Sequence, residues 1–241
     1  PPPMYNRRMQ RRAFLLSTSA ALGLLPAAEP LRVRLVTGGH NHDPELYLPF
    51  SGDPRFRTTV EPHPNAYRGN LIKSTDVLVQ YDMVRTTDEA TRTALRSFAE
   101  AGKGIVILHH AICSFPDWPW WWQEVAGGLY LNQPFEGKGP STFHHDETIE
   151  VKVAKQHPCT QGVSGFTIYD ETYNKMWISP KVDVLLRTNH SKSDGPLMWV
   201  SPYSASRVVV LQLGHGREAN TDPNWQRLVR NAIVFAGGRA S

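Results

Sequence analysis

The chain has 241 residues, of which 40% are hydrophobic and 20% are charged, an ordinary composition for a globular protein. Its formal net charge is +4, but residues 1–30 hold four arginines against Glu29, a local charge of +3, which leaves +1 for the rest. A nucleic-acid-binding function is therefore not favoured, because such proteins usually carry a basic face. The unusual features are ten histidines, all beyond residue 30, and seven tryptophans.

Residues 1–30 resemble a twin-arginine export signal. Arg11 and Arg12 precede a mildly apolar segment that is too short to span a bilayer, and Ala27 and Ala28 supply small residues for cleavage. The alternative is an ordinary N-terminal helix. The sequence thus predicts a periplasmic or secreted protein that has no membrane association once this leader is removed.

Beyond residue 30, short apolar runs alternate with helical segments, which is typical of one large α/β domain. Strands are expected at 31–36, 58–61, 76–80, 105–108, 148–153, 166–168, 182–187, 197–200 and 207–213. Helices are expected near 45–50, from an N-cap at Thr87 to about 101, and from Asp222 onward. The apolar run 105–108 predicts a central strand that is buried on both faces.

Polar residues follow four of the expected strands. They are His40 and His42, Tyr81 and Asp82, His109 and His110, and His215. The carboxyl ends of parallel strands meet at one edge of a sheet, where ligands bind. We therefore expect His40, His110 and His215 to share a pocket and to act in acid-base catalysis, since imidazole titrates near neutral pH.

The segment 170–173 follows an expected strand, and Glu171 is its best candidate for a catalytic carboxylate; the alternative is a solvated turn. The sequence requires no cofactor. However, His40 and His42, together with His215, are compatible with a divalent metal such as zinc, although no complete zinc motif is present.

Four tryptophans fall within residues 118–122, and they either form a sugar-stacking surface or wedge into the core. On the first interpretation Trp118 lies on the rim of the pocket. The other expected substrate contacts are Asp82, His109, His145 and Tyr173. Cys113 lacks the sharp glycine-flanked turn that exposes a nucleophile, so it is interpreted as structural.

Several motifs in order resemble the ThuA-like family, named after trehalose utilisation proteins. They are the segments 104–110, 114–122, 157–162 and 170–173, then Trp199, 207–209 and 213–215, and the final helix. The resemblance covers residues 31–237 as one ThuA-like domain and leaves 238–241 as a tail. It implies a class I glutamine amidotransferase-like fold, a flavodoxin-like three-layer sandwich with a mostly parallel central sheet.

The resemblance also implies a role in sugar catabolism, with 3-keto-disaccharides or related glycosides as substrates. It does not imply a functional glutamine amidotransferase, because Ala111 follows His110 where the amidotransferase cysteine would be expected. The leading hypothesis is an exported enzyme that processes a small sugar by histidine and carboxylate acid-base chemistry. The alternatives are a non-catalytic carbohydrate-binding module and a metal-dependent hydrolase, and the sequence leaves open whether the protein is a homo-oligomer.

Overall fold

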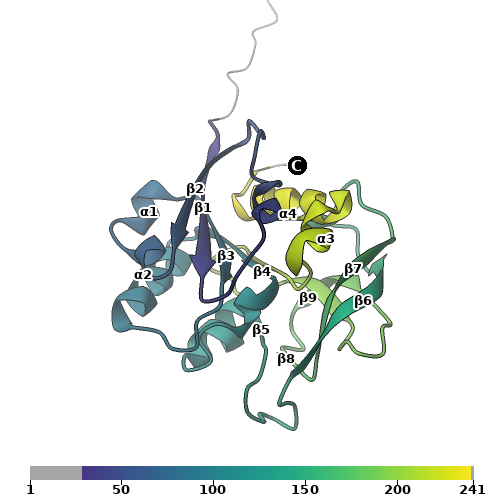
Figure 1. Ribbon diagram of the computed structural model, residues 1–241. Coiled ribbons are helices and arrows are strands. Elements are labelled where there is room, and N and C mark those ends of the chain that lie inside the picture. Colours follow the sequence, from purple (N-terminus) through teal and green to yellow (C-terminus); the bar gives the residue numbers. More distant parts are fainter. Residues whose placement is uncertain (1–28, 240–241) are drawn as a thin grey trace, which may run out of the picture.

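The computed structural model describes residues 29–239, which form a nine-stranded mixed sheet with helices packed against it (Figure 1). Residues 1–28, which include most of the expected export signal, lie outside the described residues. The strand order is β2-β1-β3-β4-β11-β10-β9-β6-β7. From β2 to β11 the neighbouring strands are parallel, and from β11 to β7 they are antiparallel.

The elements have the following bounds. The parallel strands are β1 (Leu31–Gly38), β2 (Phe56–Pro62), β3 (Val77–Asp82), β4 (Gly104–Leu108) and β11 (Val208–Leu211). The antiparallel strands are β10 (Pro196–Val200), β9 (Asp183–Arg187), β6 (Thr142–Val153) and β7 (Phe166–Asn174), and the short β5 (Gly128–Leu129) and β8 (Trp177–Ile178) pair separately. The α-helices are α1 (Leu71–Ser74), α2 (Glu89–Glu100), α3 (Gly216–Thr221) and α4 (Pro223–Ala236). Short 3-10 segments are η1 (Pro44–Tyr47), η2 (Asn65–Tyr67), η3 (His109–Cys113) and η5 (Pro158–Thr160), and η4 (Trp120–Ala126) is a π-helix.

The expected α/β fold with a large, mostly parallel central sheet is confirmed, and it is compatible with a flavodoxin-like or amidotransferase-like fold. β4 lies between β3 and β11, and all of its residues are buried, as its apolar run predicted. Among residues 29–239, no helix is both long and apolar enough to cross a membrane.

Three local expectations were wrong. The helix expected near 45–50 is only the single turn η1. The N-cap of α2 is Asp88 and not Thr87, because the Asp88 carboxylate accepts a hydrogen bond from the Thr91 N–H at 2.7 Å. The segment 170–173 is not a turn after a strand, since β7 continues through it to Asn174.

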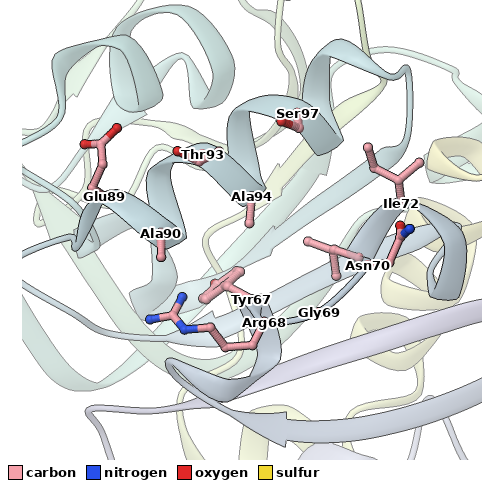
Figure 2. A pocket seen from close by; sticks show the side chains of 11 residues that line it. Tyr67, Arg68, Gly69, Asn70, Ile72, Glu89, Ala90, Thr93, Ala94 and Ser97 are labelled. Atoms are coloured by element: carbon pink, nitrogen blue, oxygen red, sulfur yellow. The ribbon is translucent and has the colours of Figure 1, made fainter.

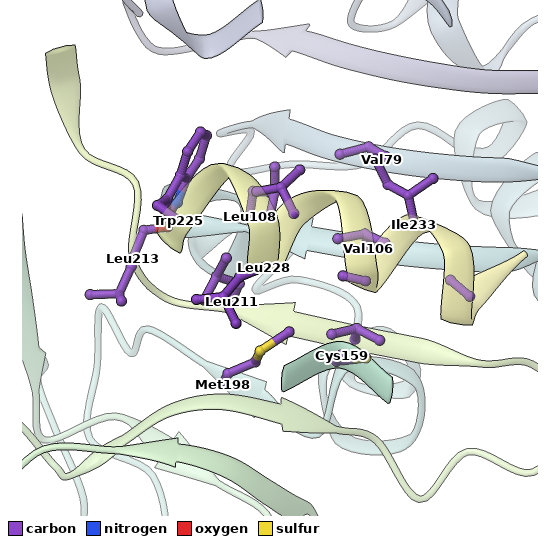
Figure 3. Close-up of a cluster of buried hydrophobic side chains, with 14 of the residues drawn as sticks. Val79, Val106, Leu108, Cys159, Met198, Leu211, Leu213, Trp225, Leu228 and Ile233 are labelled. Carbon is purple, nitrogen blue, oxygen red and sulfur yellow. Dashed lines mark hydrogen bonds between the residues drawn. The ribbon is translucent and has the colours of Figure 1, made fainter. Parts of the chain in front are cut away.

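Alternate residues of the parallel strands enter two hydrophobic clusters. Val106 packs in a cluster with Leu228 of α4, as Figure 3 shows. Its neighbour Ile105 belongs to a second cluster that includes Phe98 of α2. Helices thus bury both sides of β4 and β11, which explains why these two strands contain no polar side chain.

Asp76 joins the amino ends of neighbouring strands at the edge opposite the histidines. Its carboxylate accepts hydrogen bonds from the Arg32 backbone N–H at 3.0 Å and the Arg32 guanidinium at 2.6 and 2.9 Å. It also accepts one from the Lys103 ammonium at 3.1 Å. The bonds from Arg32 hold the pKa of Asp76 well below its usual range. Because this pKa is depressed, the interaction stabilises the fold above the unfolded-state pKa of Asp76 and is lost as the pH falls.

We therefore predict that Asp76→Asn lowers the free energy of unfolding by about 1–2 kcal/mol at neutral pH. Charge-assisted hydrogen bonds contribute about 1.5–3 kcal/mol, and solvent screening reduces this for partly exposed partners. Urea denaturation at pH 7 and at about pH 3 tests it, since the difference should shrink in acid. Asp183→Asn is the control, because its pair with Lys155 is largely exposed and should contribute little. Equal losses in both variants would contradict the assignment.

Candidate functional site

A cavity of about 150 Å³ lies at the carboxyl edge of the parallel strands. The segments that follow β1, β4 and β11 contribute His40, His110 and His215 to its lining. The β6–β7 hairpin contributes His145 and Glu171. The structure thus brings together the three histidines expected from the strand ends and the expected carboxylate, although Glu171 is buried in the wall and not placed in a turn.

His109 is the first residue after β4. Its φ is 48°, an uncommon backbone conformation for a residue that is not glycine. Its Nδ1 lies 2.9 Å from the Gln212 carbonyl oxygen, so Nδ1 must carry the proton and donate it. Its Nε2 therefore presents a lone pair, which accepts from the Tyr173 hydroxyl at 3.2 Å and lies 3.1 Å from His215 Nδ1. Burial lowers the pKa of His109 well below its ordinary value, so this imidazole is neutral.

Glu171 is the centre of the polar cluster. Its side chain is 6% exposed, and its Oε2 lies 2.8 Å from His145 Nδ1 and 3.2 Å from His215 Nδ1. Burial raises the pKa of Glu171 to about 7. A carboxyl group with such a pKa exchanges protons in the neutral range, which suits a general acid or base.

Asp170 holds the loop after β11 against β7. Its carboxylate accepts hydrogen bonds from the backbone N–H groups of Gly214 and His215, each at 2.8 Å, and of Glu171 at 2.7 Å. Burial raises the pKa of Asp170 to about 7, even though these three bonds act to lower it. Gly214 has a φ of 128°, and a Cβ there would lie 2.8 Å from Trp225 Nε1, so the loop requires glycine. The position of His215 beside Glu171 follows from this clamp.

His110 and His40 lie on the side of the cluster formed by the parallel strands. His110 Nε2 donates to the Tyr81 carbonyl oxygen at 3.0 Å, and its Nδ1 has no partner among the described residues. Burial lowers the pKa of His110 to about 3, so the ring is neutral. The exposed His40 ring lies 4.5 Å from it. The unpartnered nitrogen is an acceptor that is buried away from solvent.

His109, Glu171 and His215 form a group that could hold a metal ion, because one ligand atom of each lies within 4.8 Å of the others. The expected metal set of His40, His42 and His215 shares only His215 with this group. His42 does not line the cavity, and its Nε2 lies 2.8 Å from the Tyr47 hydroxyl.

Two expected substrate contacts lie away from the cavity. Trp118 is 6% exposed and packs against Trp120 and Trp121, with ring centroids 5.0 and 5.8 Å apart. The tryptophan run is therefore a wedge in the core, which was the alternative interpretation. Asp82 is fully buried and accepts hydrogen bonds from His63 and Tyr67, so its role is internal to the fold. By contrast, His109, His145 and Tyr173 do line the cavity.

The sequence alone did not single out several lining residues. They are Met83, Arg85, Tyr130 and Phe143, and Cys113, which was interpreted as structural, also lines the cavity. Phe143 was detectable in principle, because it precedes His145 by two positions in a strand and two-residue spacing places both on one face. Arg85 and Tyr130 lie in connecting segments, where no periodicity exists to predict their direction.

A wider and more open hollow of about 620 Å³ lies between the segment 67–72 and α2 (Figure 2). Ala90 and Ala94 line it on the side of α2 that faces Tyr67. Arg68 lies there as well, but it pairs with Asp88 at 2.6 Å. Among the described residues that line this hollow there is no histidine or cysteine, so the histidine cavity is the better candidate for chemistry.

The ThuA family model, described as trehalose utilisation, matches residues 32–236. This chain belongs to the ThuA family. A ThuA-like protein from Parabacteroides merdae is 19% identical, with a TM-score of 0.76 over 88% of this chain and 92% of that one. Another from Bacteroides uniformis is 20% identical, with a TM-score of 0.64 over 87% and 93% of the two chains.

The amidotransferase-like fold is supported by a third similar structure. A Thermoplasma acidophilum protein, described as part of a GMP synthase, is 11% identical, with a TM-score of 0.56 over 87% of this chain and 95% of that one. No curated protein sequence matches the chain.

The ThuA chain has no exposed thiol where β4 ends. His109 occupies that position, and Cys113 lies at the end of η3, where burial raises the pKa of its thiol well above the ordinary value. Cys113 and Cys159 are both free and buried, so they do not form a disulfide. The ThuA family description connects the chain with trehalose utilisation.

Proposed function

We propose that this ThuA protein is an exported enzyme of carbohydrate catabolism, with a flavodoxin-like three-layer fold, that acts on a disaccharide or keto-glycoside. The observation that carries the proposal is the contact of Glu171 with His145 at 2.8 Å and with His215 at 3.2 Å inside one cavity. A buried carboxyl group whose pKa is raised to about 7, beside two imidazoles, can accept and return protons at neutral pH. The trehalose-utilisation description of the family supports a sugar as substrate.

A keto group at C3 of a glycoside would make the reaction accessible to such a site. The carbonyl acidifies the C2–H bond, so Glu171 can remove that proton as general base. The glycosidic C1–O bond then breaks, and the imidazole of His145 donates a proton to the departing oxygen. Water then adds to the resulting C1–C2 double bond. Its oxygen bonds to C1, its proton returns to the imidazole, and Glu171 returns its proton to C2. The reaction therefore needs only positioned acid-base groups.

A non-catalytic carbohydrate-binding protein is the alternative within the same cavity. The histidines that line the cavity would then hold sugar hydroxyls without turnover. The environment of Glu171 favours catalysis over binding alone. A neutral sugar can be bound by groups that do not titrate. Burying a carboxyl group costs folding stability, and groups buried at that cost concentrate at sites where they take part in a reaction.

We predict that Glu171→Gln lowers kcat for a 3-keto-disaccharide by roughly 10²- to 10⁴-fold, the usual contribution of a general acid or base. Product formation is measured by chromatography and sugar binding by titration calorimetry. The isosteric amide should largely preserve sugar binding. Glu147→Gln is the matched control, because Glu147 also pairs with a histidine, His190 at 3.3 Å, but lies outside the cavity lining. Unchanged turnover in Glu171→Gln would overturn its role. Sugar binding by the wild type without turnover would favour the binding module.

A metal-dependent hydrolase is the second candidate, and the His109–Glu171–His215 group favours it. The contacts of 3.1 and 3.2 Å to His215 Nδ1 are close to the ligand separation of about 3.3 Å in a tetrahedral zinc site with bonds of about 2.0–2.1 Å. The Gln212 carbonyl fixes the His109 tautomer so that Nε2 is unprotonated, as metal binding requires. These three residues would hold a zinc ion, which would supply a Lewis acid and lower the pKa of bound water.

We predict that, if this candidate is correct, the purified protein binds one zinc ion and His215→Ala loses it. Metal content by mass spectrometry and zinc titration by calorimetry provide readouts that are independent of activity. His42→Ala is the control, because His42 lies outside the group and should leave binding unchanged. Zinc binding that depends on His42 and not on His215 would contradict this ligand set. Full turnover after chelation would exclude the metal-dependent mechanism and favour the metal-free acid-base mechanism.

Export is proposed from the sequence alone, on the paired Arg11 and Arg12 before the apolar segment. The proposed partner is a small-molecule sugar, with no nucleic acid and no membrane contact after the leader is removed.

We predict that replacing both arginines by lysine leaves the precursor in the cytoplasm, because twin-arginine receptors recognise the guanidinium pair. Cell fractionation and immunoblotting measure it. A lysine variant that is exported like the wild type would exclude the twin-arginine route.

A further inference from the structure

The cavity is too small to enclose a disaccharide. Its volume of about 150 Å³ lies below the range of about 300–1,000 Å³ that is usual for pockets that enclose drug-sized ligands. One sugar ring therefore uses the enclosed space. A second ring has to lie outside, on the rim of the cavity.

Phe143 is the most exposed apolar side chain that lines the cavity. It is 52% exposed, and of the five large exposed hydrophobic residues in the described part of the chain it alone lines the cavity. It pairs with Tyr173 across the β6–β7 hairpin, so it stands beside the residue whose hydroxyl contacts His109. Its ring lies 5.0 Å from the ring of His145, which binds Glu171.

The surroundings of Phe143 suit a sugar better than a protein partner. A pyranose ring has one apolar face of C–H groups and an edge of hydroxyls, and aromatic rings pack against the former. The polar lining residues His145 and Arg85 can hydrogen-bond to the hydroxyl groups at the edge of the pyranose. A protein-docking surface would need a wider apolar patch than a single phenyl ring.

We propose that Phe143 forms an outer subsite that binds the second ring of a disaccharide, while the histidine cavity holds the ring that reacts. The inference rests on the proposed carbohydrate function and adds its substrate class: the protein selects disaccharides over monosaccharides. Phe143 contacts substrate at the outer ring and takes no part in proton transfer.

The test compares Phe143→Ala, Phe143→Trp and wild type in the full chain. Phe143→Ala should raise KM for the 3-keto-disaccharide roughly two- to tenfold, the equivalent of the ~0.5–1.5 kcal/mol of an aromatic contact, with kcat nearly unchanged. The inhibition constant of the corresponding 3-keto-monosaccharide should not change, and Phe143→Trp should restore KM. Tyr169→Ala is the control, because Tyr169 is 45% exposed on the same hairpin but does not line the cavity.

The outcomes separate the subsite from the function. Wild-type turnover with an unchanged KM in Phe143→Ala overturns the outer subsite and leaves the proposed function standing. Equal weakening of the disaccharide and the monosaccharide places Phe143 at the inner ring and also overturns it. A wild-type protein that neither binds nor converts either sugar overturns both. Failure of Phe143→Trp to restore KM would show that the effect of the alanine variant is not a stacking contact.

Discussion

The candidate site depends on one buried carboxylate, that of Asp170. It accepts hydrogen bonds from the backbone N–H groups of Gly214, His215 and Glu171. These bonds connect β7 to the loop that follows β11. These two strands are far apart in the sheet, with β10, β9 and β6 between them. The β6–β7 hairpin is paired to β9 only through Lys152 and Val153, which leaves its remaining length free to turn over the carboxyl edge. Asp170 fixes it there, and only then does Glu171 meet His215.

Desolvation determines the charge of the cluster that results. Burial lowers the pKa of His109 and His110 and raises that of Glu171 to about 7, so each group is driven toward its neutral form. The cavity consequently contains several unprotonated nitrogens around one carboxyl group that titrates near neutrality. Neutral imidazole lone pairs are equally the groups that bind zinc and the groups that accept protons. The acid-base and metal candidates therefore follow from the same electrostatic arrangement, and they differ in whether a proton or a cation occupies it.

The sequence predicted the half of the site that follows from strand direction. His40, His110 and His215 come after strands whose parallel orientation is readable from short apolar runs, and such strands end at one edge. The other half depends on tertiary contacts that no local pattern contains. The continuation of β7 through Glu171 requires its pairing with β6, and the burial of Trp118 requires the packing of its neighbours in η4. The sequence predicted the architecture well because burial on both faces leaves a periodicity, whereas a hairpin that folds over an edge leaves none.

The end of β4 shows how this fold can support chemistry without a nucleophile. A φ of 48° in a non-glycine residue is energetically unfavourable, by an amount of the order of 1 kcal/mol, and such conformations concentrate at functional sites. Here the strained position holds His109, and the hydrogen bond to Gln212 offsets part of that strain while it fixes the tautomer. The turn therefore presents a nitrogen lone pair, and the nearby thiol of Cys113 is buried with a raised pKa. A lone pair in this position can orient a proton or hold a cation, but a buried imidazole that is held at Nδ1 is poorly placed to attack a substrate. The geometry is thus better suited to proton transfer or metal binding than to covalent acyl transfer.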